Sequence, residues 1–124
     1  MAFCWGAAIA PDTGNIWLRY AEQGHFIYVE NTARASILAM EHGIAGEAYN
    51  IGTGVTTSFN DIYRVVAEEM HSDIEPRYVP NPLKNYQYFT QANVAKAGRD
   101  LGFKPEFDLR AGVRKMIQAS ARST

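Results

Sequence analysis

The chain has 124 residues, of which 47% are hydrophobic, and its formal net charge is -1. This length supports one domain with a real core, and the composition argues against disorder. The near-neutral charge gives no reason to expect a nucleic-acid or anionic-membrane partner, and no apolar stretch approaches the roughly 20 residues of a membrane span. The one cysteine, Cys4, cannot form an internal disulfide, which suits the cytoplasm.

The first 24 residues are poorly patterned. Residues 1–10 form a short apolar run with no Lys or Arg before it, so we do not expect a secretion signal. Residues 11–15 (PDTGN) are typical of a turn, because Pro fixes φ and Gly tolerates positive φ. We treat residues 1–24 as an unassigned lead segment.

Extended and helical patterns alternate from residue 25. Residues 25–29 and 48–51 predict strands, and residues 75–80 predict an extended segment bounded by prolines. Each predicted helix has a capping residue before it. We expect helices over residues 32–42, 59–71, 91–101 and from 109 onward, capped by Asn31, Ser58, Thr90 and Asp108. In the first helix the apolar residues Ala33, Ile37, Met40 and Ile44 fall near helical spacing. This order predicts an α/β chain.

Motifs for metal or phosphate chemistry are weak. The histidines His25, His42 and His71 are scattered without zinc-ligand spacing, and there is no second cysteine. Gly52-Thr53-Gly54 follows a predicted strand but lacks the third glycine of a dinucleotide-binding turn, so the end of a strand is the favoured interpretation.

Two segments resemble a known family. Residues 26–35 (FIYVENTARA) and 46–54 (GEAYNIGTG), separated by one helix, are similar to the downstream half of extended short-chain dehydrogenases, the NAD-dependent nucleotide-sugar epimerases and dehydratases. A third segment, residues 86–93 (YQYFTQAN) with Gly102-Phe103, resembles the ADP-glycero-manno-heptose 6-epimerases among them.

The resemblance implies the carboxyl-terminal portion of such a fold. Residues 25–57 would end the dinucleotide-binding sheet, with residues 48–51 at its far edge, and residues 58–124 would form the nucleotide-sugar lobe. The complete enzyme would use NAD or NADP, and its substrate would be a nucleotide sugar of the ADP-heptose type. For this chain alone we expect no bound cofactor, and we expect its partner to be an upstream dinucleotide-binding half or a second copy.

The catalytic Tyr-x-x-x-Lys pair of that family is missing. The lysine lowers the tyrosine pKa so that the phenolate can accept a proton during hydride transfer. None of the seven tyrosines is followed by lysine four residues later. We therefore expect this chain to be catalytically incomplete and assign it no catalytic or cofactor-binding residue.

Three residues are candidates for substrate binding. Tyr86 matches a substrate-contacting tyrosine of the heptose epimerases, and Gln87 is a weaker polar companion. Arg77 is a candidate for the nucleotide phosphates, because a guanidinium binds two oxygens at once. The family commonly has an arginine where this chain has Gly24, which removes one expected phosphate contact. Asn31 stands where the family usually has aspartate, and we interpret it as an N-cap.

Two hypotheses remain open at this stage. The chain is either part of a truncated or split epimerase, or a stand-alone sugar-nucleotide-binding or dimerisation module without enzymatic activity. Either way, a strand separated from its sheet would expose backbone and apolar groups, which predicts self-association or poor solubility.

Overall fold

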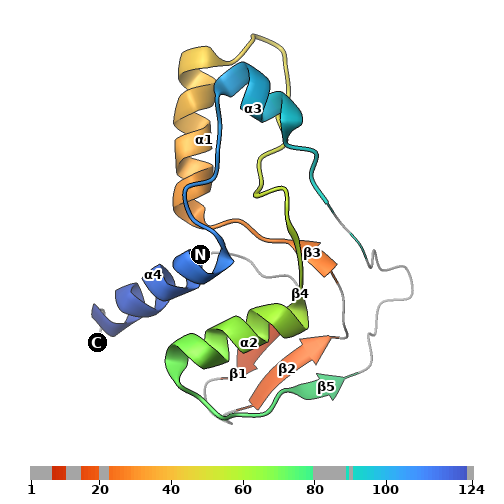
Figure 1. Cartoon of the computed structure of the whole chain (residues 1–124), viewed down its shortest axis with the longest axis vertical. Coiled ribbons are helices and arrows are strands. Elements are labelled where there is room, and N and C mark those ends of the chain that lie inside the picture. Colours follow the sequence, from red (N-terminus) through yellow and green to blue (C-terminus); the bar gives the residue numbers. More distant parts are fainter. Residues whose placement is uncertain (1–6, 11–14, 20–22, 80–88, 90, 123–124) are drawn as a thin grey trace.

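A computed structural model describes residues 7–10, 15–19, 23–79, 89 and 91–122 of the chain. The elements follow one another as an α/β chain (Figure 1). They are β1 (Ala7–Ala10), β2 (Asn15–Arg19), β3 (Gln23–His25), α1 (Val29–His42), β4 (Thr56–Ser58), α2 (Phe59–Met70), β5 (Arg77–Val79), α3 (Ala95–Leu101) and α4 (Leu109–Arg122).

The core lies between α1 and α3. Its buried members are Ala35 on α1 and the group Ala97, Leu101 and Phe103 at and just beyond α3, none more than 4% exposed. The small alanines let the two helices approach closely. Ile27, Tyr49 and other half-buried side chains pack around this cluster, so the segments on both sides of α1 share one core with α3. The predicted division of the chain at residue 57 remains a prediction.

Two small sheets lie below this helical layer in Figure 1. β1 pairs antiparallel with β2, and β2 pairs in parallel with β5, so that Trp17 is opposite Arg77. β3 pairs antiparallel with β4, with Gly24 opposite Thr57. The poorly patterned segment, residues 1–24, therefore supplies both β1 and β2. The helix α2 contacts β2.

Two strand predictions are wrong, one in its position and one because no strand forms. The strand predicted over residues 25–29 is β3, and it covers Gln23–His25 because it pairs with β4. The helix α1 already begins at Val29. Residues 48–51 form no strand, since no strand among the described residues pairs with them. A strand needs a hydrogen-bonded neighbour, and the side-chain pattern alone cannot supply one.

Two of the predicted helix caps are confirmed. The Ser58 Oγ accepts a hydrogen bond from the Asp61 backbone N–H at 3.1 Å, and the Asp108 Oδ1 accepts one from the Ala111 N–H at 2.8 Å. Thr90 lies outside the described residues, and α3 begins later than predicted, at Ala95.

Asn31 is not an N-cap, because α1 begins two residues before it and Tyr28 holds the cap position. Its side chain is instead buried, with 1% exposure, and it connects α1 to the segment leading into α4. The Asn31 Oδ1 accepts hydrogen bonds from the backbone N–H groups of Glu106 and Phe107 at 2.9 and 3.2 Å, and Nδ2 donates to the Phe107 carbonyl at 2.7 Å.

The start of α4 packs closely on the same end of α1. The rings of Tyr28 and Phe107 meet edge to face, with centroids 5.4 Å apart. A Cβ at Gly112 would lie 2.9 Å from the Tyr28 Cβ, so glycine is needed for this approach. The Lys115 Nζ donates a 2.6 Å hydrogen bond to Glu30, which adds an ion pair to the contact.

The apolar spacing noted in the first helix does not mark its buried face. Ile37, Met40 and Ile44 are 56%, 88% and 57% exposed, and Ala33 is also exposed. The face that contacts α3 carries Asn31, Ala35 and the half-buried Leu38 instead. α1 therefore has apolar residues on two faces, of which one is uncovered.

Candidate functional site

Only one of the three predicted substrate-binding residues falls among those that the structure describes. Arg77 is exposed at the first position of β5. Tyr86 and Gln87 lie outside the described residues. The candidate surface around Arg77 is formed by β5 and the beginning of α2, which a side-chain hydrogen bond joins.

A hydrogen bond fixes β5 to the first turn of α2. The Tyr78 hydroxyl donates to the Asn60 Oδ1 at 2.9 Å. Tyr78 is 57% exposed, and because it follows Arg77 directly in β5, the two side chains leave the strand on opposite faces. Sequence reasoning missed Asn60 and Tyr78, because the bond joins two separate elements.

The N-terminus of α2 is not a ready anion site. Helix N-termini attract phosphate through their unpaired N–H groups and dipole. Here Ser58 already accepts from the Asp61 N–H, and the Asp61 carboxylate adds negative charge in the first turn. Arg64 is in turn paired with Asp61 at 2.6 Å. These charges compensate one another, so the beginning of α2 is not itself a phosphate site, and Arg77 stays the predicted phosphate ligand.

Gly24 has a packing role at its place in β3. A Cβ added there would lie 3.0 Å from the Phe26 ring, closer than ordinary van der Waals contact. Phe26 packs edge to face on the buried Phe59, with ring centroids 5.4 Å apart. The arginine that the family commonly carries at this position would therefore displace Phe26. The tight aromatic contact thus gives a packing reason for glycine at this position.

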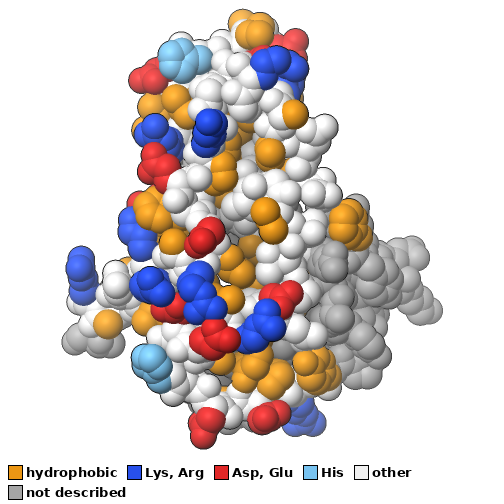
Figure 2. Space-filling model, viewed as in Figure 1, with side chains coloured by type: hydrophobic (Ala, Val, Ile, Leu, Met, Phe, Trp, Pro, Cys, Tyr) orange, Lys and Arg blue, Asp and Glu red, His pale blue; other side chains and the backbone are white. Residues whose placement is uncertain are grey.

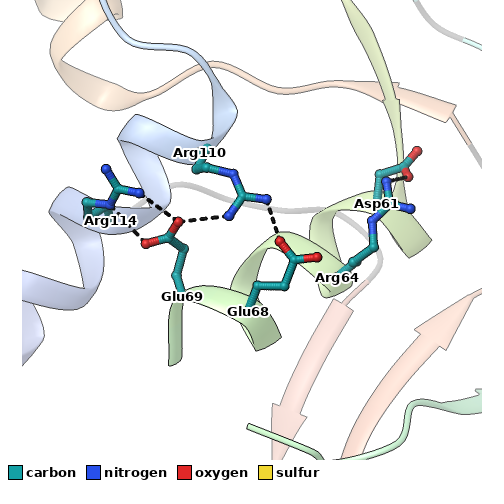
Figure 3. A network of polar contacts seen from close by, with 6 residues as sticks. All are labelled: Asp61, Arg64, Glu68, Glu69, Arg110 and Arg114. Atoms are coloured by element: carbon teal, nitrogen blue, oxygen red, sulfur yellow. Dashed lines mark hydrogen bonds and ion pairs between the residues drawn. The ribbon is translucent and has the colours of Figure 1, made fainter. Parts of the chain in front are cut away.

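A cluster of charges holds α4 against α2 (Figure 3). The Arg110 Nη1 and Arg114 Nε donate to opposite oxygens of Glu69, both at 2.9 Å, and Arg110 also reaches Glu68 at 2.5 Å. Hydrogen bonds from Arg114 and Arg110 lower the pKa of Glu69 to about 2. Figure 2 shows this mixed-sign group on the lower part of the surface. The arginines are already paired with carboxylates, so the cluster fastens helices together and is not a phosphate site.

The described ranges carry neither a metal-binding cluster nor a helix that could span a membrane. These residues contain no group of three or more His, Cys, Asp or Glu side chains that could hold a metal ion. In the same ranges no helix is long and apolar enough to span a bilayer.

Comparison with known proteins places these features in a wider fold. No family model matches the chain. Over 92 residues it is 33% identical to a putative UDP-glucose 4-epimerase of Methanocaldococcus jannaschii, a match covering 74% of this chain and 29% of the relative. The chain thus spans less than a third of that curated relative's length.

Solved structures agree with this match. UDP-glucose 4-epimerase of Thermotoga maritima, solved with UDP-glucose, is 31% identical with a TM-score of 0.76, over 83% of this chain and 33% of that one. ADP-L-glycero-D-manno-heptose-6-epimerase of Helicobacter pylori is 26% identical with a TM-score of 0.74, over 85% and 32%. Similar structures from Pseudomonas aeruginosa and Bordetella bronchiseptica contain NADPH and NADH.

Proposed function

This chain has the fold of the carboxyl-terminal portion of an extended short-chain dehydrogenase of the NAD-dependent epimerase/dehydratase type, and we propose that it is the nucleotide-sugar-binding portion of such an enzyme. The observation that carries the proposal is the 31% identity and TM-score of 0.76 to an epimerase solved with UDP-glucose. We propose further that the sugar nucleotide is of the ADP-heptose type. Residues 86–93 support this substrate, as does the similarity to the heptose epimerase of Helicobacter pylori.

The proposed division of labour follows from the residues present. Residues 25–57 end the dinucleotide-binding part and residues 58–124 form the substrate lobe, in which Arg77 binds a nucleotide phosphate and Tyr86 and Gln87 contact the sugar nucleotide. The exposed position of Arg77 at the first residue of β5 supports this role. The chemistry is incomplete, because no tyrosine has the lysine four residues later that would lower its pKa. NAD or NADP belongs to the complete enzyme and binds through residues outside this chain.

Calorimetry on the purified chain tests the proposal with ADP-heptose, UDP-glucose and NADPH as separate ligands. We expect heat with ADP-heptose, weaker heat with UDP-glucose and none with NADPH. Arg77→Ala should weaken ADP-heptose binding about tenfold, as loss of a charge-assisted contact commonly does. Arg64→Ala is the matched control, because Arg64 is another exposed arginine and the proposal gives it no contact with the ligand.

Two results would count against the proposal. Absence of heat with every nucleotide sugar refutes the binding function. Binding of NADPH together with epimerisation of the heptose nucleotide refutes catalytic incompleteness, and the chain would then be an enzyme by itself.

A further inference from the structure

The strand that carries Arg77 is the shortest of the three-stranded sheet. β5 has three residues, and it lies at the edge of the sheet with β2 as its one neighbour among the described strands (Figure 1). The pairing with β2 is parallel, and parallel pairs are slightly less stable per residue than antiparallel ones. Few backbone contacts therefore hold β5, and a side-chain bond to another element matters for its position.

The helix α2, in contrast, is fixed at both ends. At its beginning Phe59 is 3% exposed, and Ser58 caps the first turn. At its end Glu69 accepts hydrogen bonds from Arg110 and Arg114 of α4 (Figure 3). A helix that is buried at one end and ion-paired at the other is a firm support for a weakly held strand.

One side-chain hydrogen bond connects β5 to this support. The Tyr78 hydroxyl donates to the Asn60 Oδ1 at 2.9 Å, and Asn60 is half-buried in the first turn of α2. Because successive side chains leave a strand on opposite faces, a bond on the Tyr78 side directs Arg77 to the face turned away from Asn60. Rotation of β5 about its own axis would redirect the Arg77 guanidinium, and it would break this bond.

We propose that Asn60 is a positioning residue for the candidate site: through the Tyr78 hydroxyl it holds β5 in the orientation that presents Arg77 to an anionic ligand. A guanidinium binds two phosphate oxygens at once only when its planar fork faces them, so its direction affects affinity. The inference rests on the proposed function, in which Arg77 binds a nucleotide phosphate. It deepens that function by naming the residue that sets the direction of the arginine, and Asn60 acts on the ligand only through Arg77.

Calorimetry with ADP-heptose tests the effect on binding. Tyr78→Phe removes the hydroxyl and keeps the ring, and Asn60→Leu removes the acceptor. Each should weaken binding about threefold to fivefold, less than the roughly tenfold effect of Arg77→Ala, because the guanidinium is kept but less well directed. Added to Arg77→Ala, Tyr78→Phe should cause no further loss, since the hydrogen bond acts through that arginine.

Amide hydrogen exchange gives a second measurement, which needs no ligand. Exchange at residues 77–79 should be at least about threefold faster in Tyr78→Phe, because a less firmly held strand opens more often. Asn60→Asp should keep exchange slow, because a carboxylate oxygen still accepts from the Tyr78 hydroxyl. Tyr49→Phe is the matched control. It loses a hydroxyl that accepts from the Ile44 N–H at 3.1 Å beside the core of α1 and α3, so affinity and exchange at residues 77–79 should not change.

Three results overturn the proposal. One is unchanged exchange at residues 77–79 in Tyr78→Phe. Another is unchanged affinity in Tyr78→Phe when Arg77→Ala weakens binding. The third is a full further loss when Tyr78→Phe is added to Arg77→Ala, which would make Tyr78 a ligand contact. Absence of heat with the unmodified chain refutes the proposed function, whereas exchange at residues 77–79 reports on the Asn60 bond without a ligand, so the two failures are distinguishable.

Discussion

Asn31 offers the sharpest test of how this fold is held together. Its amide makes three hydrogen bonds to the backbone of Glu106 and Phe107 and is 1% exposed. Asn31→Ala removes all three and leaves two N–H groups and one carbonyl without a partner. A buried group left unpaired costs about 1–3 kcal/mol, and the three contacts share one side chain, so they do not add fully. We expect a loss of about 2–4 kcal/mol, out of the roughly 5–15 kcal/mol that stabilise a domain.

The assay is urea unfolding followed by far-ultraviolet circular dichroism. With a slope of about 1–3 kcal/mol per molar urea, the midpoint of Asn31→Ala should fall by about 1–2 M. Ser36→Ala is the control, because the Ser36 hydroxyl bonds only the Thr32 carbonyl on an exposed part of α1. Equal midpoints for the two variants would refute the importance of the buried amide.

Asn31→Asp separates the two halves of that amide. The aspartate can still accept hydrogen bonds from the N–H groups of Glu106 and Phe107. It cannot donate to the Phe107 carbonyl, and it places a carboxylate oxygen against that carbonyl. We expect lower stability than wild type at pH 7 and a smaller deficit as pH falls, because the protonated carboxyl regains a donor. Equal stability of Asn31→Asp and the unmodified chain at pH 7 would show that the Asn31 Nδ2 does not donate to the Phe107 carbonyl in solution.

Three further predictions address contacts between elements. Gly112→Ala should lower stability by about 1–3 kcal/mol in thermal melts, since its Cβ would meet Tyr28 at 2.9 Å; Gly98→Ala, with its nearest contact at 3.7 Å, should not. The pKa of Glu69 is lowered from 4.5 to about 2, so its stabilising effect is complete above pH 4.5 and is lost as pH falls toward 2. The urea midpoint of Glu69→Gln should therefore change less between pH 4.5 and 2 than that of the unmodified chain. Parallel plots of midpoint against pH for the two proteins would contradict this. Ser58→Ala should cost about 1 kcal/mol in urea titrations, and an unchanged midpoint would mean that the cap is not stabilising.

The features predicted correctly from the sequence are local ones. The Ser58 and Asp108 caps depend on a side chain and an N–H group three residues apart, so neighbouring residues determine them. The α/β class and the family resemblance were also predictable, because they depend on the order of elements and on short segments.

The features that the sequence did not predict depend on distant partners. The strand predicted over residues 25–29 forms instead at Gln23–His25 as β3, because it pairs with β4, about 33 positions away. Asn31 looked like an N-cap because its polarity fits that position, yet its partners lie 75 and 76 residues later. Residues 48–51 have the side chains of a strand, but strand formation also requires a neighbour.

The candidate site shows the same limit. Arg77 could be selected by residue type, but the hydrogen bond from Tyr78 to Asn60 joins residues 18 positions apart and depends on how β5 and α2 meet. The stripe of exposed apolar residues along α1, namely Ala33, Ile37, Met40 and Ile44, illustrates a different difficulty. Its spacing identifies an apolar face correctly, while the sequence does not say which of two faces the described chain buries.

The parallel pairing of β2 with β5 has a consequence for the order in which the chain folds. The β1–β2 hairpin is local and forms within about 1–10 microseconds once its residues are free. β5 joins β2 only after a loop of about sixty residues closes, and such closure slows folding. During synthesis at about 5–20 residues per second, the hairpin therefore waits several seconds for its third strand. The beginning of the chain gains its place in the sheet only after α1 and α2 have been made.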